Sequence, residues 1–178
     1  MTELHAALAE RVRDWRAAGY PCPYSAIAEI LEYAIENEHE GPSFPRTGNL
    51  RFLRAPQLRA LETYWYLRVV ERTPHIADLY RRLFPAPSER LAALGLNTPA
   101  LTTLALDLGP DSLLERIRTD DAFVKAHKLG VLRETLTLDY PSYILALAMG
   151  AGKTVLIGAI VATEFALALE YPEPPDGL

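Results

Sequence analysis

The sequence predicts an α/β fold, with a mostly helical N-terminal region followed by a strand, a glycine-rich loop and a long helix. Two observations support this prediction. Up to about residue 135, apolar residues recur at helical spacing between proline and glycine breaks. Beyond that point, the continuous apolar run Tyr143–Ala148 precedes two glycines and a long apolar segment, as in a buried parallel strand that leads into a helix.

The first 48 residues are expected to form a helical region. A first amphipathic helix ends before Gly19 and the Pro21–Pro23 turn, and its apolar positions are Leu4, Leu8, Val12 and Trp15. A second helix is expected over 24–38, with an apolar face made of Ile27, Ile30, Leu31 and Ala34. The turn-rich segment 41–48 closes this region.

Residues 49–135 form the second expected region. A helix should begin near Ala55 and Pro56, because proline suits the first helical turn, and its apolar face carries Leu58, Leu61 and Trp65. Shorter helical pieces are expected after it, separated by prolines and glycines, at 75–83, 89–94, 112–117 and 122–129. The third region, 136–178, holds the expected strand, the loop and a helix over 153–170.

Composition restricts the class of protein. The single cysteine, Cys22, excludes an internal disulfide, so a reducing cytoplasm is the expected location. Charged residues within the first fifteen positions rule out the apolar core of a signal peptide. The net charge of −5 gives no support for nucleic-acid binding by the whole chain. No pair of histidines has the spacing of metal ligands, so no zinc site is expected.

The loop Met149–Thr154 is the segment with the clearest chemistry. A strand, a glycine-rich turn, Lys-Thr and a helix together surround phosphate oxygens with backbone N–H groups and a helix N-terminus. Gly150 and Gly152 permit positive φ angles and close approach of the backbone. Lys153 can reach the β and γ phosphates, and the hydroxyl of Thr154 can bind Mg²⁺. The strict phosphate-loop pattern would have glycine at position 147, where this chain has Leu147.

A membrane span is an alternative interpretation of the apolar segment 143–169. A spanning helix needs roughly 20 apolar residues in succession, whereas Lys153 and Glu164 interrupt this segment. A lysine in mid-bilayer would cost about 2.5 to 3.5 kcal/mol, and the neighbouring glycines would weaken the helix further. The phosphate loop is therefore preferred, and no membrane partner is expected.

The segment Leu147-Ala-Met-Gly-Ala-Gly-Lys-Thr154, followed by Val-Leu-Ile-Gly-Ala-Ile160, resembles motif I of superfamily 2 helicases and translocases. It is especially similar to the DEAD/DEAH-box proteins typified by the restriction subunit of type III restriction enzymes. Members of this family often lack the first glycine of the strict pattern. The resemblance implies that 136–178 is the start of an incomplete RecA-like phosphate-loop NTPase domain.

A second segment, Leu53-Arg-Ala-Pro-Gln57-Leu-Arg-Ala60, resembles the arginine-x-x-glutamine element that precedes motif I in this family. The resemblance implies that Gln57 contacts the adenine of ATP. An ordinary polar residue in the first turn of a helix remains the alternative interpretation of Gln57. An inserted helical segment, roughly 73–134, would separate the two elements.

The function implied by the resemblance is that of an ATP-dependent DNA helicase or translocase of the type III restriction endonuclease kind. ATP and Mg²⁺ would be its cofactors. Lys153 and Thr154 would be its catalytic residues in this chain, and the ATP site would consist of Gln57, Met149, Gly150, Ala151, Gly152, Lys153 and Thr154.

The same resemblance implies that this chain is the N-terminal part of a larger enzyme and hydrolyses ATP poorly on its own. Double-stranded DNA would be bound through parts of the protein outside this chain, and a methyltransferase subunit would be a further partner. The alternative function is a helical interaction module that binds nucleotide without catalysis.

Overall fold

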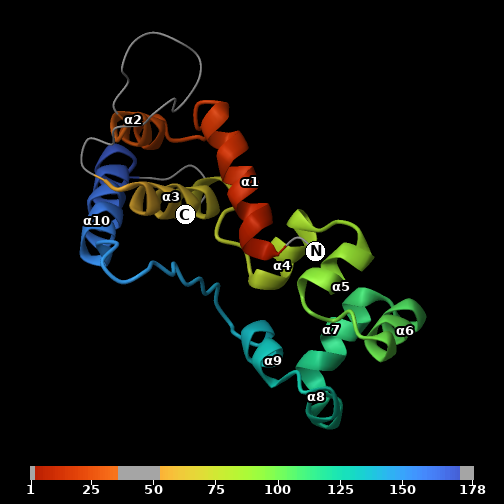
Figure 1. Cartoon of the computed structure of the whole chain (residues 1–178). Helices are drawn as coiled ribbons and strands as arrows, with labels where there is room; N and C mark the ends of the chain where they lie inside the picture. Colours follow the sequence, from red (N-terminus) through yellow and green to blue (C-terminus); the bar gives the residue numbers. More distant parts are fainter. Residues whose placement is uncertain (1–2, 36–52, 173–178) are drawn as a thin grey trace. The chain divides into compact units, whose positions relative to one another are not determined.

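The computed structural model describes residues 3–35 and 53–172, and the regular structure in these ranges is helical (Figure 1). In chain order the elements are α1 (Leu4–Ala17), α2 (Ser25–Tyr33), α3 (Ala55–Trp65), the π-helical turn η1 (Tyr66–Val70), α4 (Ile76–Leu83), α5 (Pro87–Ala93), α6 (Pro99–Leu108), α7 (Pro110–Thr119), α8 (Asp121–His127), α9 (Gly130–Leu136) and α10 (Lys153–Glu170). The described residues contain no β-strand. The α/β fold predicted from the sequence is therefore wrong, and the described part of the chain is all-helical.

The strand expected at 143–148 is the source of this error. These residues adopt no regular secondary structure, and the described ranges provide no second strand for them to pair with. A parallel strand needs a neighbour for its backbone hydrogen bonds and a cover on both faces, yet Ile144 is 90% exposed. An apolar run is compatible with a buried strand, but it does not show that a neighbouring strand exists to pair with it. The start of a RecA-like domain expected at 136–178 is thus absent from the described residues.

The helix boundaries follow local signals in the sequence. α3 and α10 begin at Ala55 and Lys153, as predicted, and α1 contains the predicted apolar positions. Two helices, α6 and α9, were not predicted. The predicted turn at 41–48 and the last residues of the second predicted helix lie outside the described ranges.

Residues 1–8 and 74–143 make up one compact unit. Prolines occupy the first turns of α5, α6 and α7, where the fixed φ suits the helix and the missing N–H costs nothing. Thr98 and Asp120 cap α6 and α8, each accepting a hydrogen bond from the backbone N–H three residues on. The buried apolar core of the unit is Leu91, Leu96, Leu101, Ala105, Leu113, Leu114, Ile117, Phe123, Val124 and Leu136.

Two hydrogen bonds join the beginning and the end of the 74–143 segment. The Nδ1 atom of His75 accepts from the backbone N–H of Ala77, so the proton of the neutral ring lies on Nε2. Nε2 then donates to the backbone oxygen of Leu138, at 3.0 Å. The hydroxyl of Tyr143 donates to the backbone oxygen of Pro74. The chain therefore enters and leaves this helical segment at neighbouring points.

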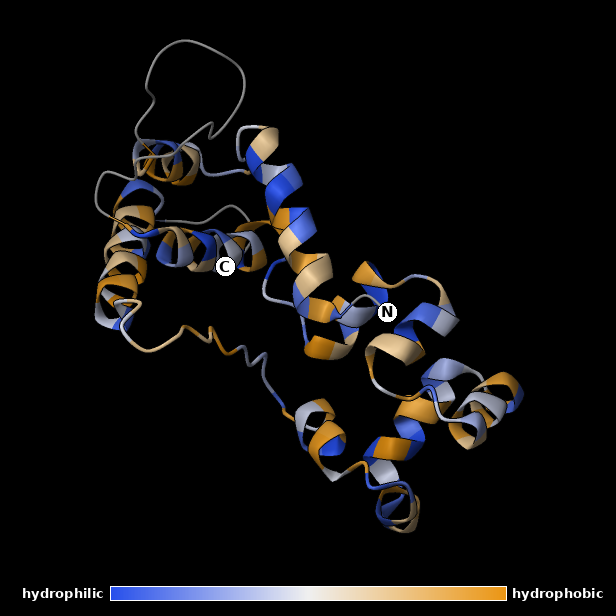
Figure 2. Ribbon diagram, viewed as in Figure 1, coloured by the Kyte–Doolittle hydropathy of each residue, from blue (hydrophilic) through white to orange (hydrophobic). Residues whose placement is uncertain are grey.

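Residues 9–73 and 144–178 make up the second unit. Here α10 packs against α3 and α2, and its inward face carries Leu156, Thr163 and Leu167. Figure 2 shows hydrophobic residues recurring along the whole of α10, and part of them lies in solvent: Val155, Ile157, Val161, Phe165 and Leu169. Even so, none of the described helices, α10 included, is long and apolar enough to cross a membrane.

Candidate phosphate-binding site

The loop between Ala148 and Lys153 is a tight turn made by two glycines. Gly150 and Gly152 both have a φ of +76°, the left-handed region that side chains disfavour. The N–H of Ala151 donates to the oxygen of Ala148 at 3.2 Å, which closes the turn. The positive φ angles expected at both glycines are therefore present. Because left-handed residues turn successive N–H groups towards one side, this backbone can form a concave anion site.

The N-terminus of α10 lies directly behind this turn. Gly152 is its N-cap residue, and the first bonds of the helix run from the N–H groups of Val155 and Leu156 to the oxygen of Gly152. The N–H groups of Lys153 and Thr154 precede the first intrahelical bonds and are available to an anion. The positive end of the helix dipole adds to the attraction. The side chains of Lys153 and Thr154 are exposed, so both can reach a ligand in the loop.

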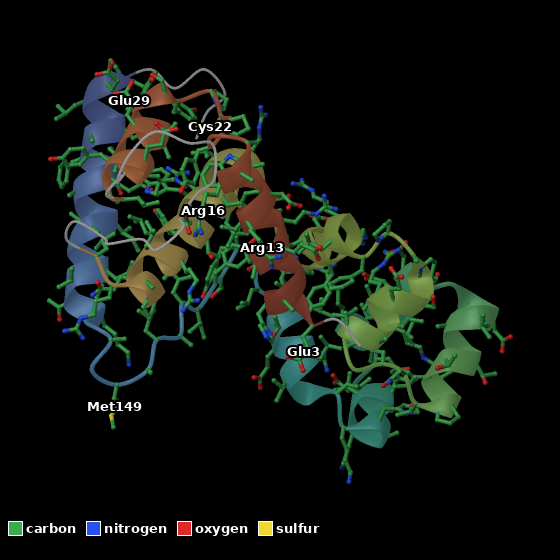
Figure 3. The ribbon with its side chains drawn as sticks, turned by 45° about the horizontal axis from the view of Figure 1, so that its top comes forward. Glu3, Arg13, Arg16, Cys22, Glu29 and Met149 are labelled. Atoms are coloured by element: carbon green, nitrogen blue, oxygen red, sulfur yellow. The ribbon has the colours of Figure 1, made fainter. Side chains whose placement is uncertain are left out.

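Met149 lies at the tip of the loop and is 96% exposed. In Figure 3 its side chain projects away from the helices, beyond the lower end of α10. Only its backbone is in a position to line the turn. Ala151 is half-buried between the two glycines. The structure thus brings together the whole predicted segment, Met149–Thr154, with the cation of Lys153 and the hydroxyl of Thr154 at its helical end.

The N-terminus of α3 contacts the same loop, although about 95 residues lie between them in the sequence. The Nη1 atom of Arg54 donates to the oxygen of Gly150 at 2.9 Å, and Nε2 of Gln57 donates to the oxygen of Gly152, also at 2.9 Å. The Oε1 atom of Gln57 accepts from the backbone N–H of Arg54 at 2.7 Å. The two predicted site elements therefore meet in one unit of the structure. We call Arg54 and Gln57 the α3 clamp.

Packing at Gly152 depends on the α3 clamp. A Cβ atom added at Gly152 would collide with the side-chain amide of Gln57, whereas a Cβ atom added at Gly150 would meet nothing within 4 Å. The two glycines share the same φ and differ in their surroundings. Two features therefore favour glycine at position 152: its positive φ angle and the amide of Gln57 that packs against it.

Further hydrogen bonds hold α3 and α10 together away from the loop. The indole Nε1 of buried Trp65 donates to Oγ1 of Thr163 at 3.0 Å. The hydroxyl of Tyr64 and the Nε atom of Arg68 both donate to Oε1 of Glu164. Burial and then the Glu164 carboxylate raise the pKa of Tyr64 to about 12, because both disfavour the phenolate. These contacts fix the relative position of two helices whose N-termini both lie at the loop.

Thr154 is the residue expected to bind Mg²⁺. Its exposed hydroxyl stands in the first turn of α10, where a cation bound to a nucleotide could be reached. The described residues contain no cluster of three or more acidic, histidine or cysteine side chains that would form a metal site without the nucleotide. Mg²⁺ in nucleotide sites is usually held by one or two carboxylates together with substrate phosphates and water. The hydroxyl of Thr154 would supply one ligand of such a site.

Arg54 was not among the site residues predicted from the sequence, although it contacts the loop. The sequence placed Arg54 in the same element as Gln57, but nothing in its local pattern indicates that the guanidinium bonds to a loop almost a hundred residues later. The available signal was the pair of motifs itself. Two elements that serve one ligand must approach each other in the fold, and Gly152 leaves room for the approach.

Together, the fold and the site define a helical protein with a glycine–lysine loop at a helix N-terminus. No protein-family model, curated protein or solved structure matches this chain. The geometry of the loop and the motifs in the sequence are therefore what indicate a function for this chain.

Proposed function

We propose that the loop Met149–Thr154 binds the phosphates of ATP, and that this chain is the ATP-binding part of an ATP-dependent DNA helicase or translocase of the type III restriction kind. The observation that carries the proposal is the pair of left-handed glycines directly before the first turn of α10, which begins with Lys153 and Thr154. A glycine turn of this kind at a helix N-terminus suits a phosphate group.

Each residue of the loop has a role in this proposal. The N–H groups of the two glycines, Lys153 and Thr154 donate to phosphate oxygens, whereas the N–H of Ala151 is used within the turn. The glycines also let the backbone approach the phosphates closely. The ammonium of Lys153 neutralises charge on the β and γ phosphates, which also lowers the barrier to transfer of the γ-phosphoryl group. Mg²⁺, when bound with ATP, supplies further neutralisation of phosphate charge, and the hydroxyl of Thr154 would help to hold it.

The wider function is proposed from the motif resemblance. ATP hydrolysis would drive movement on double-stranded DNA, with a methyltransferase subunit as a further partner, in the cytoplasm. The alternative function is a nucleotide-binding interaction module without catalysis. The helical architecture of the described residues favours this alternative, because binding needs the loop alone, whereas hydrolysis needs further groups around the γ-phosphate.

Binding of MgATP by Lys153→Ala tests the first part of the proposal. Calorimetric titration should show binding by the unaltered chain and a loss of about tenfold or more for Lys153→Ala, because one charge-assisted hydrogen bond contributes roughly 1.5 to 3 kcal/mol. Lys125→Ala is the matched control, since it removes an exposed lysine from α8. Equal affinities of the two variants would refute the phosphate loop.

The second part is tested by the ATPase activity of protein purified from its natural source. Stimulation by double-stranded DNA, abolished by Lys153→Ala, would support the motor. Binding of ATP without turnover in the presence or absence of DNA would favour the interaction module.

A further inference from the structure

The backbone carbonyls of the loop are the starting point of this inference. When a turn directs its N–H groups inward towards an anion, its carbonyl oxygens must face outward. Two of these oxygens, on Gly150 and Gly152, accept hydrogen bonds from α3 clamp side chains at 2.9 Å each. The oxygen of Gly152 also accepts the first two bonds of α10. The outer side of the loop is thus held in place by polar contacts.

We infer that Arg54 and Gln57 are positioning residues that hold the loop in its phosphate-binding conformation, and that the site selects the triphosphate group and not the base. This inference rests on the proposed function and deepens it. It assigns the α3 clamp a task different from the adenine contact that the family resemblance implies for Gln57.

The surroundings of Gln57 support this assignment. Gln57 is only 3% exposed. Its amide oxygen is bonded to the N–H of Arg54 at 2.7 Å, and its amide nitrogen is bonded to the oxygen of Gly152. Recognition of adenine needs an amide that presents a donor and an acceptor together to the edge of the base. In this structure each end of the amide already makes one hydrogen bond inside the protein, and the burial of Gln57 keeps its remaining donor and lone pair from the edge of a base.

Arg54 holds the neighbouring glycine from a more open position. Its guanidinium donates through Nη1 to the oxygen of Gly150, and its side chain is exposed. A guanidinium donates to carbonyl oxygens but cannot accept, so the contact fixes the direction of this carbonyl. The bond between the N–H of Arg54 and Gln57 links the two positions. Residues at the N-terminus of α3 therefore bind the carbonyl oxygens of both left-handed glycines.

The inference predicts that loss of the α3 clamp weakens every ligand that carries a triphosphate. Calorimetric titrations should compare MgATP, MgGTP and magnesium tripolyphosphate on the full chain, with Gln57→Met, Arg54→Met and the control Arg59→Ala, which alters an exposed residue of α3. Each clamp variant should lose about two- to tenfold in affinity, the size of one hydrogen bond, and by the same factor for all three ligands. Arg59→Ala should bind all three as the unaltered chain does.

A mutant cycle gives a readout that a general loss of stability would not move. Gly152→Ala places a Cβ atom against the amide of Gln57, whereas Gly150→Ala has the same φ and no such neighbour. The loss of tripolyphosphate affinity caused by Gly152→Ala should shrink in a Gln57→Ala background. The loss caused by Gly150→Ala should be the same in both backgrounds. Should the Gln57 variants fail to fold, the comparison of Arg54→Met with Arg59→Ala carries the same expectation.

The outcomes separate the inference from the proposed function. If the unaltered chain binds none of the three ligands, the proposed function fails before any clamp variant is made. If Gln57→Met loses affinity for ATP alone, Gln57 recognises the base and the inference is overturned. If neither clamp variant loses affinity, or if both glycines respond equally to Gln57→Ala, the α3 clamp does not position the loop. An equal loss for all ligands together with the unequal glycine response supports it.

Discussion

At the scale of single residues, the ion pair of Arg16 with Glu62 places a charged carboxylate in the protein interior. The carboxylate of Glu62 is fully buried, and it accepts from Nε of Arg16 at 2.6 Å and from the hydroxyl of Tyr20 at 2.7 Å. In Figure 3 Arg16 extends from α1 towards α3. The hydrogen bond to Glu62 is the largest cause of the raised pKa of Arg16. Burial, followed by the charge of Glu62, raises the pKa of Tyr20.

Arg16→Met should therefore destabilise the second unit strongly. Removing one partner of a buried ion pair leaves the other charge uncompensated, which typically costs about 3 to 5 kcal/mol. Denaturant unfolding followed by tryptophan fluorescence would measure the loss, because Trp15 and Trp65 both belong to this unit. Arg13→Met, at an exposed position of the same helix, is the control. A loss below about 1 kcal/mol, the size of an exposed ion pair, would show that the pair contributes little to stability.

At the scale of elements, the contact between α3 and α10 predicts a pH dependence. Tyr64 has a pKa of about 12 in the folded protein, above the ordinary tyrosine value of 10.0. The folded chain keeps this proton at pH values where the unfolded chain has lost it. The contribution of Tyr64 to stability is then complete below pH 10 and is lost as pH rises through about 12.

Tyr64→Phe should accordingly flatten the fall in unfolding free energy between pH 10 and pH 12. Burial of Tyr66, with Glu71 beside it, also raises its pKa to about 12, so the double change with Tyr66→Phe should flatten the curve further. Equilibrium unfolding at a series of pH values measures both curves, with Tyr140→Phe, which alters an exposed ring, as the control. An unchanged slope in Tyr64→Phe would mean that its hydroxyl is solvated in the folded state.

The elements also show what a single sequence could predict. Local signals predicted helix starts at Pro56 in α3 and at Gly152 before α10. The start of α6 was missed although Thr98 caps it and Pro99 occupies its first turn. The sequence indicated the positive φ angles of Gly150 and Gly152 for the same local reason. The strand at 143–148 was wrong because strand formation depends on a partner elsewhere in the chain. α9 was missed because Gly130 opens it without a side-chain cap.

The contacts of the candidate site were only partly predictable. The resemblance indicated that Gln57 and the loop serve one site, but it did not indicate the bonds from Arg54 and Gln57 to the glycine oxygens. These bonds join residues far apart in the chain, and neither hydrophobic periodicity nor a helix-capping signal can predict a contact at that separation. The choice between a positioning and a base-recognising role for Gln57 became possible only once its burial was known.

At the scale of the whole molecule, the chain divides into two compact units, and the 74–143 segment has adjacent ends. Replacing residues 76–137 with a short glycine–serine linker should leave the second unit folded and its affinity for MgATP unchanged. The reason is that His75 and Leu138 already lie within hydrogen-bond distance, so a short linker can span them. Circular dichroism and titration would measure both properties.

Substituting a linker of the same length for 86–109 is the appropriate control for that deletion, because it breaks the core of the first unit without joining its ends. Loss of MgATP binding in the 76–137 variant, with cooperative melting retained, would mean that the 74–143 segment contributes to the site.

The adjacent ends of the 74–143 segment also affect how quickly the two helices at the site can find each other. The contacts that join α3 to α10 link residues separated by 95 to 100 positions in the sequence. Such a large sequence separation ordinarily slows folding. The contacts inside 74–143 are more local, since α6, α7, α8 and α9 follow one another closely and pack together. Once that segment has folded and His75 has formed its hydrogen bond with Leu138, the effective chain length between α3 and α10 is shortened by the length of the segment. The closure entropy of the contact between α3 and α10 then falls, because the effective chain length between the two helices of the candidate site is shorter than their sequence separation.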